Sequence, residues 1–132
     1  MKNERPSLDL WLREAREDPS AAGCGMYLMH NGVVRETARA RVRQGDLDAP
    51  AVRGMRFGYD REKAAAAAEA ARAMPGIGYV RFWLNEGELS LGDDIMLVLI
   101  GGDIRPHVVD ALQFLVGTLK SECVTEEEIY EG

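Results

Sequence analysis

The 132 residues give room for one ordinary domain, and the balance of 46% hydrophobic and 29% charged residues excludes wholesale disorder, collagen and a coiled-coil rod. The 16 basic and 22 acidic residues leave a net charge of −6. An acidic chain lacks the basic face that nucleic acid and anionic membranes require, so we expect neither as a partner, although a local basic pocket is compatible with the net charge.

The first expected element is a short helix over residues 7–17. Ser7 is a suitable N-cap, and the apolar residues that follow share one helical face. Asp, Pro, Ser and Gly residues cluster after this helix and predict a break before residue 26.

Residues 26–29 are apolar and strand-like, and residues 33–42 resume with β-branched side chains and three arginines. The Asn31-Gly32 pair between them is a turn signal. Two interpretations stay open: a hairpin that turns at Asn31-Gly32, or one long strand with a bulge at Gly32. The polar residues 43–50 then predict a loop.

Residues 52–59 alternate in the way of a strand, and Asp60 is a good N-cap for the clearest helix in the chain. Five consecutive alanines, residues 64–68, lie in this helix, which runs on to residue 74 and stops at a Pro-Gly pair. Alanine has the best helix propensity, and small side chains let a helix lie close on a sheet.

Residues 78–84 predict another strand, and residues 86–93 predict a tight turn region with a short strand inside it. Residues 95–100 are apolar at every position, as expected of a central strand with both faces covered. The last helix is expected over residues 104–119, with Pro106 harmless in its first turn.

This order of elements predicts an α+β fold, with a mainly antiparallel sheet and helices packed on one face. We expect a single domain over residues 1–132. It would comprise the short N-terminal helix, a core over residues 25–121 and an acidic C-terminal segment over residues 122–132.

Several chemistries lack a motif in this sequence. It contains no G-x-G-x-x-G, Walker or G-x-S-x-G pattern, and Cys24 and Cys123 stand far apart, with no ligand spacing to a histidine. We therefore expect no metal site and reduced structural thiols, with a disulfide as the open alternative. The polar start, and an apolar run no longer than residues 95–100, predict a cytoplasmic protein.

Three basic residues are candidates for binding an anion. Arg35 follows the Asn-Gly pair, Arg105 lies in the first turn of the last helix, and Lys120 lies at the end of that helix. A cation at a helix N-terminus opposes the helix dipole, so Arg105 is the odd one of the three. The free N–H groups at that end favour an anion, which Arg105 would help to hold.

Over residues 25–128 the chain resembles the large, catalytic subunit of molybdopterin synthase. The most specific stretch is GELSLGDD at residues 87–94, before an apolar strand and a helix that begins near Arg105 and ends in a Leu-Lys pair. Upstream, NGVVR at residues 31–35 is similar to the family's Gly-x-Val-Arg. The resemblance rests on the order and spacing of these pieces together.

The resemblance implies an α/β-hammerhead-like core and a homodimer within a heterotetramer that also contains a small ubiquitin-like sulfur carrier. The carrier's C-terminal thiocarboxylate enters a pocket, and its sulfur passes to a cyclic pyranopterin phosphate in molybdenum cofactor biosynthesis. By position, Arg35 and Arg105 would bind anions, and Lys120 would be the catalytic lysine, a proton donor or an electrostatic stabiliser. This chemistry requires no metal or organic cofactor.

The sequence departs from the family at several basic positions. Ile104 stands where the family has a histidine, Asn85 where it has an arginine, and Glu127 where it has a second pocket lysine. Two histidines are candidates to replace the missing groups: His30 beside the Asn-Gly pair, and His107, which shares a helix side with Ile104.

Three consecutive glutamates, Glu126, Glu127 and Glu128, would oppose a phosphate and a carboxylate unless they point to solvent. Thr125 and Glu128 fit the capping box of a short terminal helix. We expect this helix to hold the carboxylates in solvent, as is usual for a run of charges.

Three functions stay open at this point. The first is a molybdopterin synthase catalytic subunit that transfers sulfur. The second is a catalytically impaired relative that acts as a binding or regulatory module for a ubiquitin-like sulfur carrier. The third is a pocket recruited to another substrate, which a cationic ligand near residues 126–128 would signal.

Overall fold

The computed structural model describes residues 2–36, 45 and 51–130. Two short helical turns, η1 and η2, accompany the regular helices and strands. In chain order the elements are α1 (Leu8–Glu17), η1 (Pro19–Gly23), β1 (Met26–Val33), β2 (Val52–Tyr59), α3 (Arg61–Arg72), β3 (Ile77–Leu84), β4 (Gly87–Ser90), β5 (Asp94–Gly102), α4 (Arg105–Thr118), η2 (Leu119–Cys123) and β6 (Val124–Tyr130).

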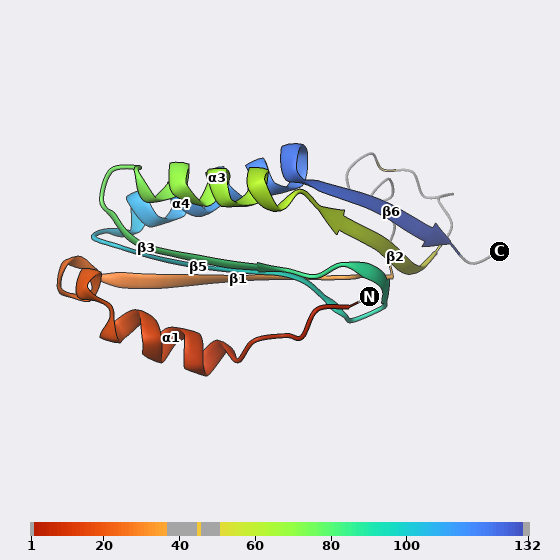
Figure 1. The fold of residues 1–132 in the computed structure, drawn as a ribbon, viewed down its shortest axis with the longest axis horizontal. Coiled ribbons are helices and arrows are strands. Elements are labelled where there is room, and N and C mark those ends of the chain that lie inside the picture. Colours follow the sequence, from red (N-terminus) through yellow and green to blue (C-terminus); the bar gives the residue numbers. More distant parts are fainter. Residues whose placement is uncertain (1, 37–44, 46–50, 131–132) are drawn as a thin grey trace.

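Within the described residues the strands form two antiparallel sheets, ordered β1-β5-β3 and β4-β2-β6. Figure 1 shows the first sheet between helical layers, while β2 and β6 extend beyond the ends of α3 and α4. This arrangement confirms the α+β fold class. It also confirms that residues 95–100 belong to a central strand, because β5 lies between two neighbours and is buried from Ile95 to Gly102.

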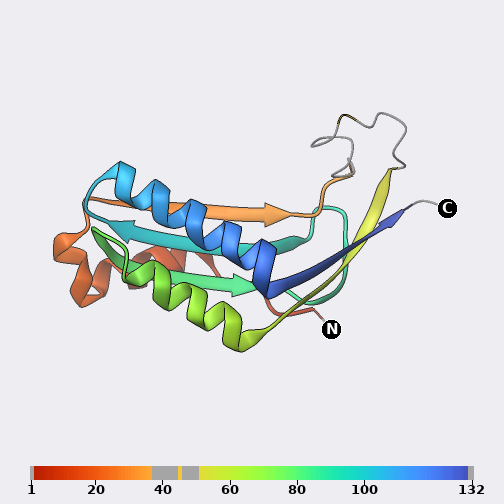
Figure 2. The same ribbon diagram turned by 90° about the horizontal axis from the view of Figure 1, so that it is seen from above.

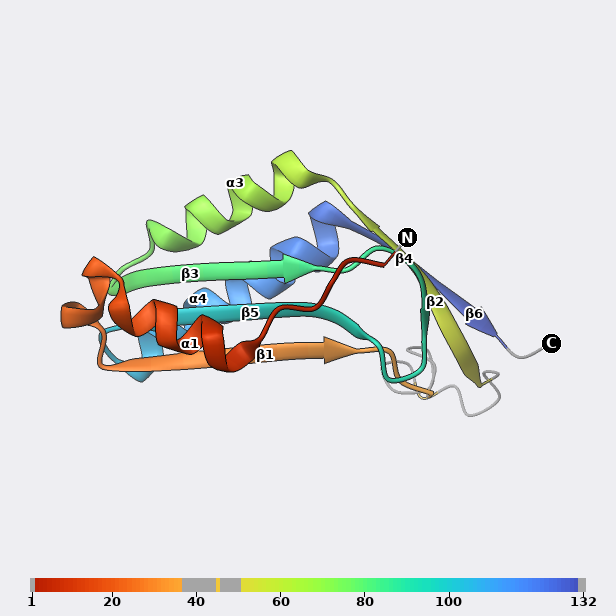
Figure 3. The same ribbon diagram turned by 60° about the horizontal axis from the view of Figure 1, so that its bottom comes forward.

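The two faces of the first sheet are covered by different helices. α3 and α4 share one face, as expected, and pack on Val98 and Ile100 (Figure 2). α1 lies across the opposite face, where Trp11 and Ala15 pack against Leu97 and Leu99 (Figure 3). Each face of β5 therefore has a hydrophobic cluster of its own.

Local capping explains where the helices begin. The Ser7 hydroxyl accepts a hydrogen bond from the Leu10 N–H at 3.2 Å, and the Asp60 carboxylate accepts one from the Lys63 N–H at 3.0 Å. As predicted, small side chains let α3 lie close on the sheet. Its buried residues are all alanines: Ala64, Ala67, Ala68 and Ala71. No helix in the described part of the chain is long and apolar enough to cross a membrane.

β1 decides between the two interpretations of the Asn31-Gly32 pair. Both residues continue the strand, because Asn31 pairs with Leu97 and Gly32 pairs with Met96. The register shifts only after Gly32, so the strand with a bulge is confirmed and the hairpin is wrong. The predicted strand beyond residue 36 and the predicted loop over residues 43–50 lie outside the described residues, apart from residue 45.

The C-terminal segment corrects another prediction. Residues 124–130 form β6, paired antiparallel with β2, and not a short helix capped by Thr125. The capping-box pattern is a local signal, whereas β2 offers a row of backbone donors and acceptors that need partners. Pairing with a strand some 70 positions away in the sequence outweighs the local signal.

Replacing Trp11 with alanine tests how strongly the packing of α1 on the first sheet stabilises the fold. Trp11 is 3% exposed and also carries the Arg81 guanidinium over its ring at 4.7 Å, so we expect Trp11→Ala to lower the free energy of unfolding by about 3–5 kcal/mol. Leu12→Ala, on the same helix but at a residue 40% exposed, should lower it by less than about 1 kcal/mol. Denaturant unfolding of both variants would check this, and equal effects would show that α1 does not dock through Trp11.

Candidate functional site

Lys120 lies in the π-helical turn η2, which follows α4 directly. Leu119 and Cys123 on either side of it are buried, and Lys120 itself is exposed. A π-turn is rare and occurs frequently at functional sites. Here the two buried neighbours anchor the turn, so that the lysine between them projects from the protein.

His30 of β1 is the predicted residue that the structure brings to Lys120. Its ring is partly buried, and its Nε2 has no hydrogen-bond partner within the described residues. Burial lowers the pKa of His30, and the positive charge of Lys120 lowers it further. His30 is therefore neutral at pH 7, next to a lysine with which no described acidic residue forms an ion pair.

Arg105 and His107 lie at the other end of α4. Arg105 is exposed, and the His107 Nδ1 lies 2.7 Å from the Asp103 carboxylate, a contact that holds the pKa of Asp103 below its usual range. α4 has 14 residues and is therefore about 21 Å long. One protomer thus cannot place both Arg105 and Lys120 against the same small ligand.

Arg35 follows the end of β1 and is exposed. The residue before it is fixed on both sides of its backbone: the Val34 N–H donates to the Asp93 carbonyl at 3.0 Å, and the Val34 carbonyl accepts from the Gly92 N–H at 2.9 Å. The turn between β4 and β5 therefore fixes the backbone directly before Arg35.

The three glutamates of β6 point to different faces of the second sheet. Glu127 lies opposite Arg56 of β2, and the two form an exposed ion pair at 3.2 Å. Glu88 of β4 lies opposite Arg56 on its other side, which places the guanidinium between two carboxylates on one face. Arg56 on the neighbouring strand thus compensates the negative charge of Glu127.

Glu126 and Glu128 lie on the opposite face of β6, where Glu126 is paired with Phe57 and Glu128 with Met55. Both are half-buried. The expectation that all three carboxylates lie in solvent therefore holds for Glu127 alone.

An open groove of about 540 Å³ lies on the second sheet. Gly58 and Gly87 contribute no side chains to its lining, which leaves the space open. Among the lining residues, Glu88 and Glu127 bring two carboxylates to one face of the sheet and Arg56 brings one guanidinium, while Glu126 belongs to the opposite face. Such a lining is unsuited to a phosphate or a carboxylate, so an anionic ligand fits better at Lys120 or Arg35 than in this groove.

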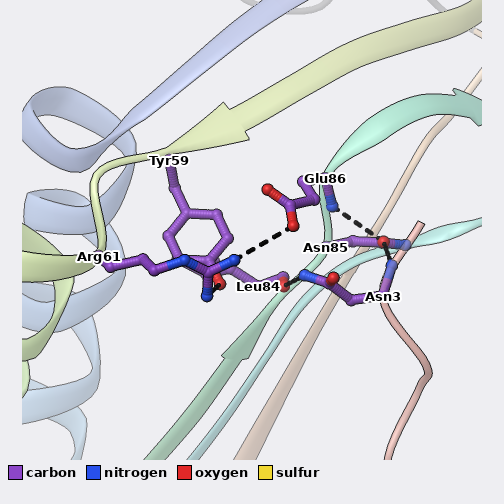
Figure 4. A network of polar contacts seen from close by, with 6 residues as sticks. All are labelled: Asn3, Tyr59, Arg61, Leu84, Asn85 and Glu86. Atoms are coloured by element: carbon purple, nitrogen blue, oxygen red, sulfur yellow. Dashed lines mark hydrogen bonds and ion pairs between the residues drawn. The ribbon is translucent and has the colours of Figure 1, made fainter. Parts of the chain in front are cut away.

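Asn85 has a structural role in the polar network of Figure 4. It is 5% exposed; its Oδ1 accepts hydrogen bonds from the N–H groups of Asn3 and Glu86 at 2.8 and 2.9 Å, and its Nδ2 donates to the Asp94 carbonyl at 2.8 Å. Every one of these groups is satisfied inside the protein. Asn85 therefore supports the fold at a position where the sequence resemblance led us to expect a basic residue.

Arg61 is a cation in the same region that the sequence did not single out. It donates to the Tyr59 hydroxyl at 2.7 Å, pairs with Glu86 at 3.2 Å and lies over the Tyr59 ring at 5.0 Å (Figure 4). The one available signal was its place in the first turn of the predicted helix after Tyr59, which is too common to mark a site.

The electrostatic effect of Lys120 on His30 can be tested by titration. We expect Lys120→Gln to raise the pKa of His30 toward its ordinary value, because the substitution removes a nearby positive charge. NMR titration of the histidine ring would measure this. Arg105→Gln removes the same charge from the far end of α4 and should leave the pKa of His30 unchanged. Equal shifts in both variants would contradict the placement of Lys120.

Known proteins share this fold. The family model described as MoaE protein matches residues 2–122. Molybdopterin synthase from Staphylococcus aureus matches at TM-score 0.72 and 16% identity, over 97% of this chain and 88% of that one. The molybdopterin cofactor biosynthesis protein E from Burkholderia multivorans matches at 0.71 and 19%, over 98% and 84%.

A complex of subunits 1 and 2 of the molybdopterin-converting factor from Helicobacter pylori contains a chain that matches at TM-score 0.65 and 13% identity, over 96% of this chain and 80% of that one. At such identities a likeness to solved structures shows the fold alone. No curated protein matches the sequence. Because the family model covers nearly the whole chain, however, this protein belongs to the MoaE family, the large subunit of molybdopterin synthase.

Proposed function

We propose that this protein is a working catalytic subunit, which transfers sulfur from the thiocarboxylate of a small ubiquitin-like carrier to a cyclic pyranopterin phosphate. The observation that carries the proposal is the exposed Lys120 in its π-turn, without an ion-pair partner in the described residues and beside a neutral His30. The cytoplasmic location expected from the sequence is part of the same proposal.

The chemistry assigned to Lys120 follows from its surroundings. Sulfur transfer from an acyl group develops negative charge on oxygen and sulfur, and a lysine ammonium stabilises such charge or donates a proton to it. A carboxylate paired with the lysine would cancel that effect. A neutral imidazole leaves the positive charge intact.

Arg35 and Arg105 are proposed to hold the anionic groups of the ligands. Arg35 follows the end of the strand that carries His30, while Arg105 is about 21 Å from Lys120 along α4. If both arginines act on one ligand, Arg105 comes from a second copy of the chain. On that condition, the homodimer that the sequence resemblance implied would complete the site.

The small carrier is the proposed partner. The Helicobacter pylori structure of the same fold is a complex of the two subunits of the molybdopterin-converting factor, which supports a two-subunit assembly here. The carrier's tail would reach Lys120 in an extended conformation, since a thiocarboxylate at a chain terminus has to enter end-on.

A second function is favoured by two observations. Glu127 is in an ion pair with Arg56, and Asn85 is in a fully satisfied structural network, so two basic positions of the family hold groups with other roles. A protein that binds the carrier but has lost sulfur transfer would show this pattern.

Replacing Lys120 with alanine separates the two functions. Purified protein would be mixed with the thiocarboxylated carrier and the pyranopterin precursor, and dithiolene formation followed in a single turnover. We expect Lys120→Ala to slow the transfer by about 100-fold or more, because one positioned charge or proton donor is removed. Dimerisation and carrier binding should be unchanged, and Lys63→Ala, on the exposed start of α3, should transfer sulfur normally.

The other outcomes are equally informative. Transfer by Lys120→Ala at the wild-type rate would contradict the role of Lys120. Wild-type protein that binds the carrier tightly without forming product would be a binding module. Absence of both product and binding would leave this chain with the family's fold alone.

A further inference from the structure

The segment before α1 crosses the junction between the two sheets and runs toward β4 (Figure 3). Asn3 fixes it there: its N–H donates to the Asn85 Oδ1 at 2.8 Å, and its side-chain amide donates to the Leu84 carbonyl at 2.9 Å (Figure 4). Since Asn85 is itself buried, this anchor consists of neutral hydrogen bonds and does not depend on charge. We call residues 2–5 the N-terminal strap.

Two cations of the strap neutralise the acidic turn between β4 and β5. The Lys2 ammonium lies 2.6 Å from the Asp93 carboxylate, and the Arg5 Nε lies 2.6 Å from the Asp94 carboxylate. The hydrogen bond from Lys2, more than any other contact, holds the pKa of Asp93 below its usual range. The Asp93 carboxylate is therefore ionised at neutral pH, and the strap pairs one cation with each of the two acidic residues of the turn.

The same turn also holds the backbone between the end of β1 and Arg35. The Asp93 carbonyl and the Gly92 N–H bond the backbone of Val34, and the Asp94 carboxylate accepts a hydrogen bond from the Asn31 side chain at 2.9 Å. The turn thus lies between the strap on one side and the end of β1 on the other.

We propose that the strap belongs to the anion-binding site: Lys2 and Arg5 cancel the charges of Asp93 and Asp94, so that a phosphate or carboxylate can approach Arg35. Without them, two carboxylates at the turn would attract the Arg35 guanidinium and repel the ligand. The inference rests on the proposed function for the role of Arg35 in anion binding and for the identity of the anion. Lys2 and Arg5 act through their effect on Arg35 and are positioning residues.

The test uses the double variant Lys2→Gln/Arg5→Gln, which keeps the neutral anchor at Asn3. In single-turnover sulfur transfer at about 0.05 M ionic strength, we expect the half-saturating concentration of the pyranopterin phosphate to rise roughly three- to tenfold, with an unchanged rate at saturation. At about 0.5 M salt the difference should nearly vanish, because screening removes it.

Two comparison variants make the readout specific. Arg13→Gln/Arg16→Gln on α1 gives the chain the same net charge and should behave as wild type. Lys2→Arg/Arg5→Lys keeps both charges and should restore the wild-type half-saturation. An unchanged half-saturation in Lys2→Gln/Arg5→Gln would reduce the strap to a mechanical tether and overturn the proposal.

Amide hydrogen exchange at Val34 and Gly92 separates charge from structure. It should stay slow in the double variant, because the backbone bonds of the turn remain. Fast exchange together with a lower rate at saturation would show that the strap acts by folding the turn, and would also overturn the proposal.

The strap stays testable if the wild type forms no product, an outcome that removes the proposed function alone. Titration with inorganic phosphate, followed on the Arg35 side-chain Nε resonance, should then show binding that is weaker in Lys2→Gln/Arg5→Gln than in wild type at low salt. Equal phosphate affinity in the two proteins would contradict the proposal.

Discussion

Burial of β5 on both faces is the constraint on which the rest of the structure depends. Its residues from Ile95 onward are buried, with α3 and α4 over one face and α1 over the other. β5 also pairs with β1 on one edge and β3 on the other. A strand enclosed in this way fixes the register of its neighbours, because a slip by one residue would turn every apolar side chain of a neighbour to the wrong face.

The location of the candidate site follows from that register. His30 of β1 lies opposite Val98, four residues before the end of β5 at Gly102, which corresponds to about 13 Å along the strand. α4 starts just after β5 and returns along the same face for about 21 Å, in contact with β1 and β5. α4 is therefore long enough to carry the turn that follows it past the level of His30, and Lys120 comes near enough for its charge to lower the pKa of His30.

Sequence reasoning succeeded where the signals were local. The apolar run of β5, the caps at Ser7 and Asp60 and the periodicity of the long helices each identify an element within about a dozen residues. It failed where a partner distant in the sequence determines the local structure. The Asn31-Gly32 pair has the composition of a hairpin turn, yet it continues β1 because β5 supplies a partner for it. The terminal glutamates have a helix-capping pattern, yet they pair with β2.

The candidate site divides in the same way. Arg35, Arg105 and Lys120 were found by their positions along the chain, but only the fold shows that Lys120 lies with His30 and that Arg105 lies a helix length away. Arg56 and Arg61 were missed because their acidic partners are 71 and 25 positions distant in the sequence. A lone arginine on a strand or in a first helical turn has no feature that distinguishes it until that partner is known.

Local neutralisation of carboxylates explains how an acidic chain can present a site for anions. The net charge of −6 would suggest repulsion, but screening limits the reach of an exposed charge to about 8 Å, so nearby pairs decide the local field. Several of the described carboxylates are paired with cations: Glu127 with Arg56, Glu86 with Arg61, and the acidic turn with the strap. Exposed pairs of this kind add at most about 1 kcal/mol each to stability. Their larger effect is to cancel charge locally, and no acidic residue in the described ranges forms an ion pair with Lys120.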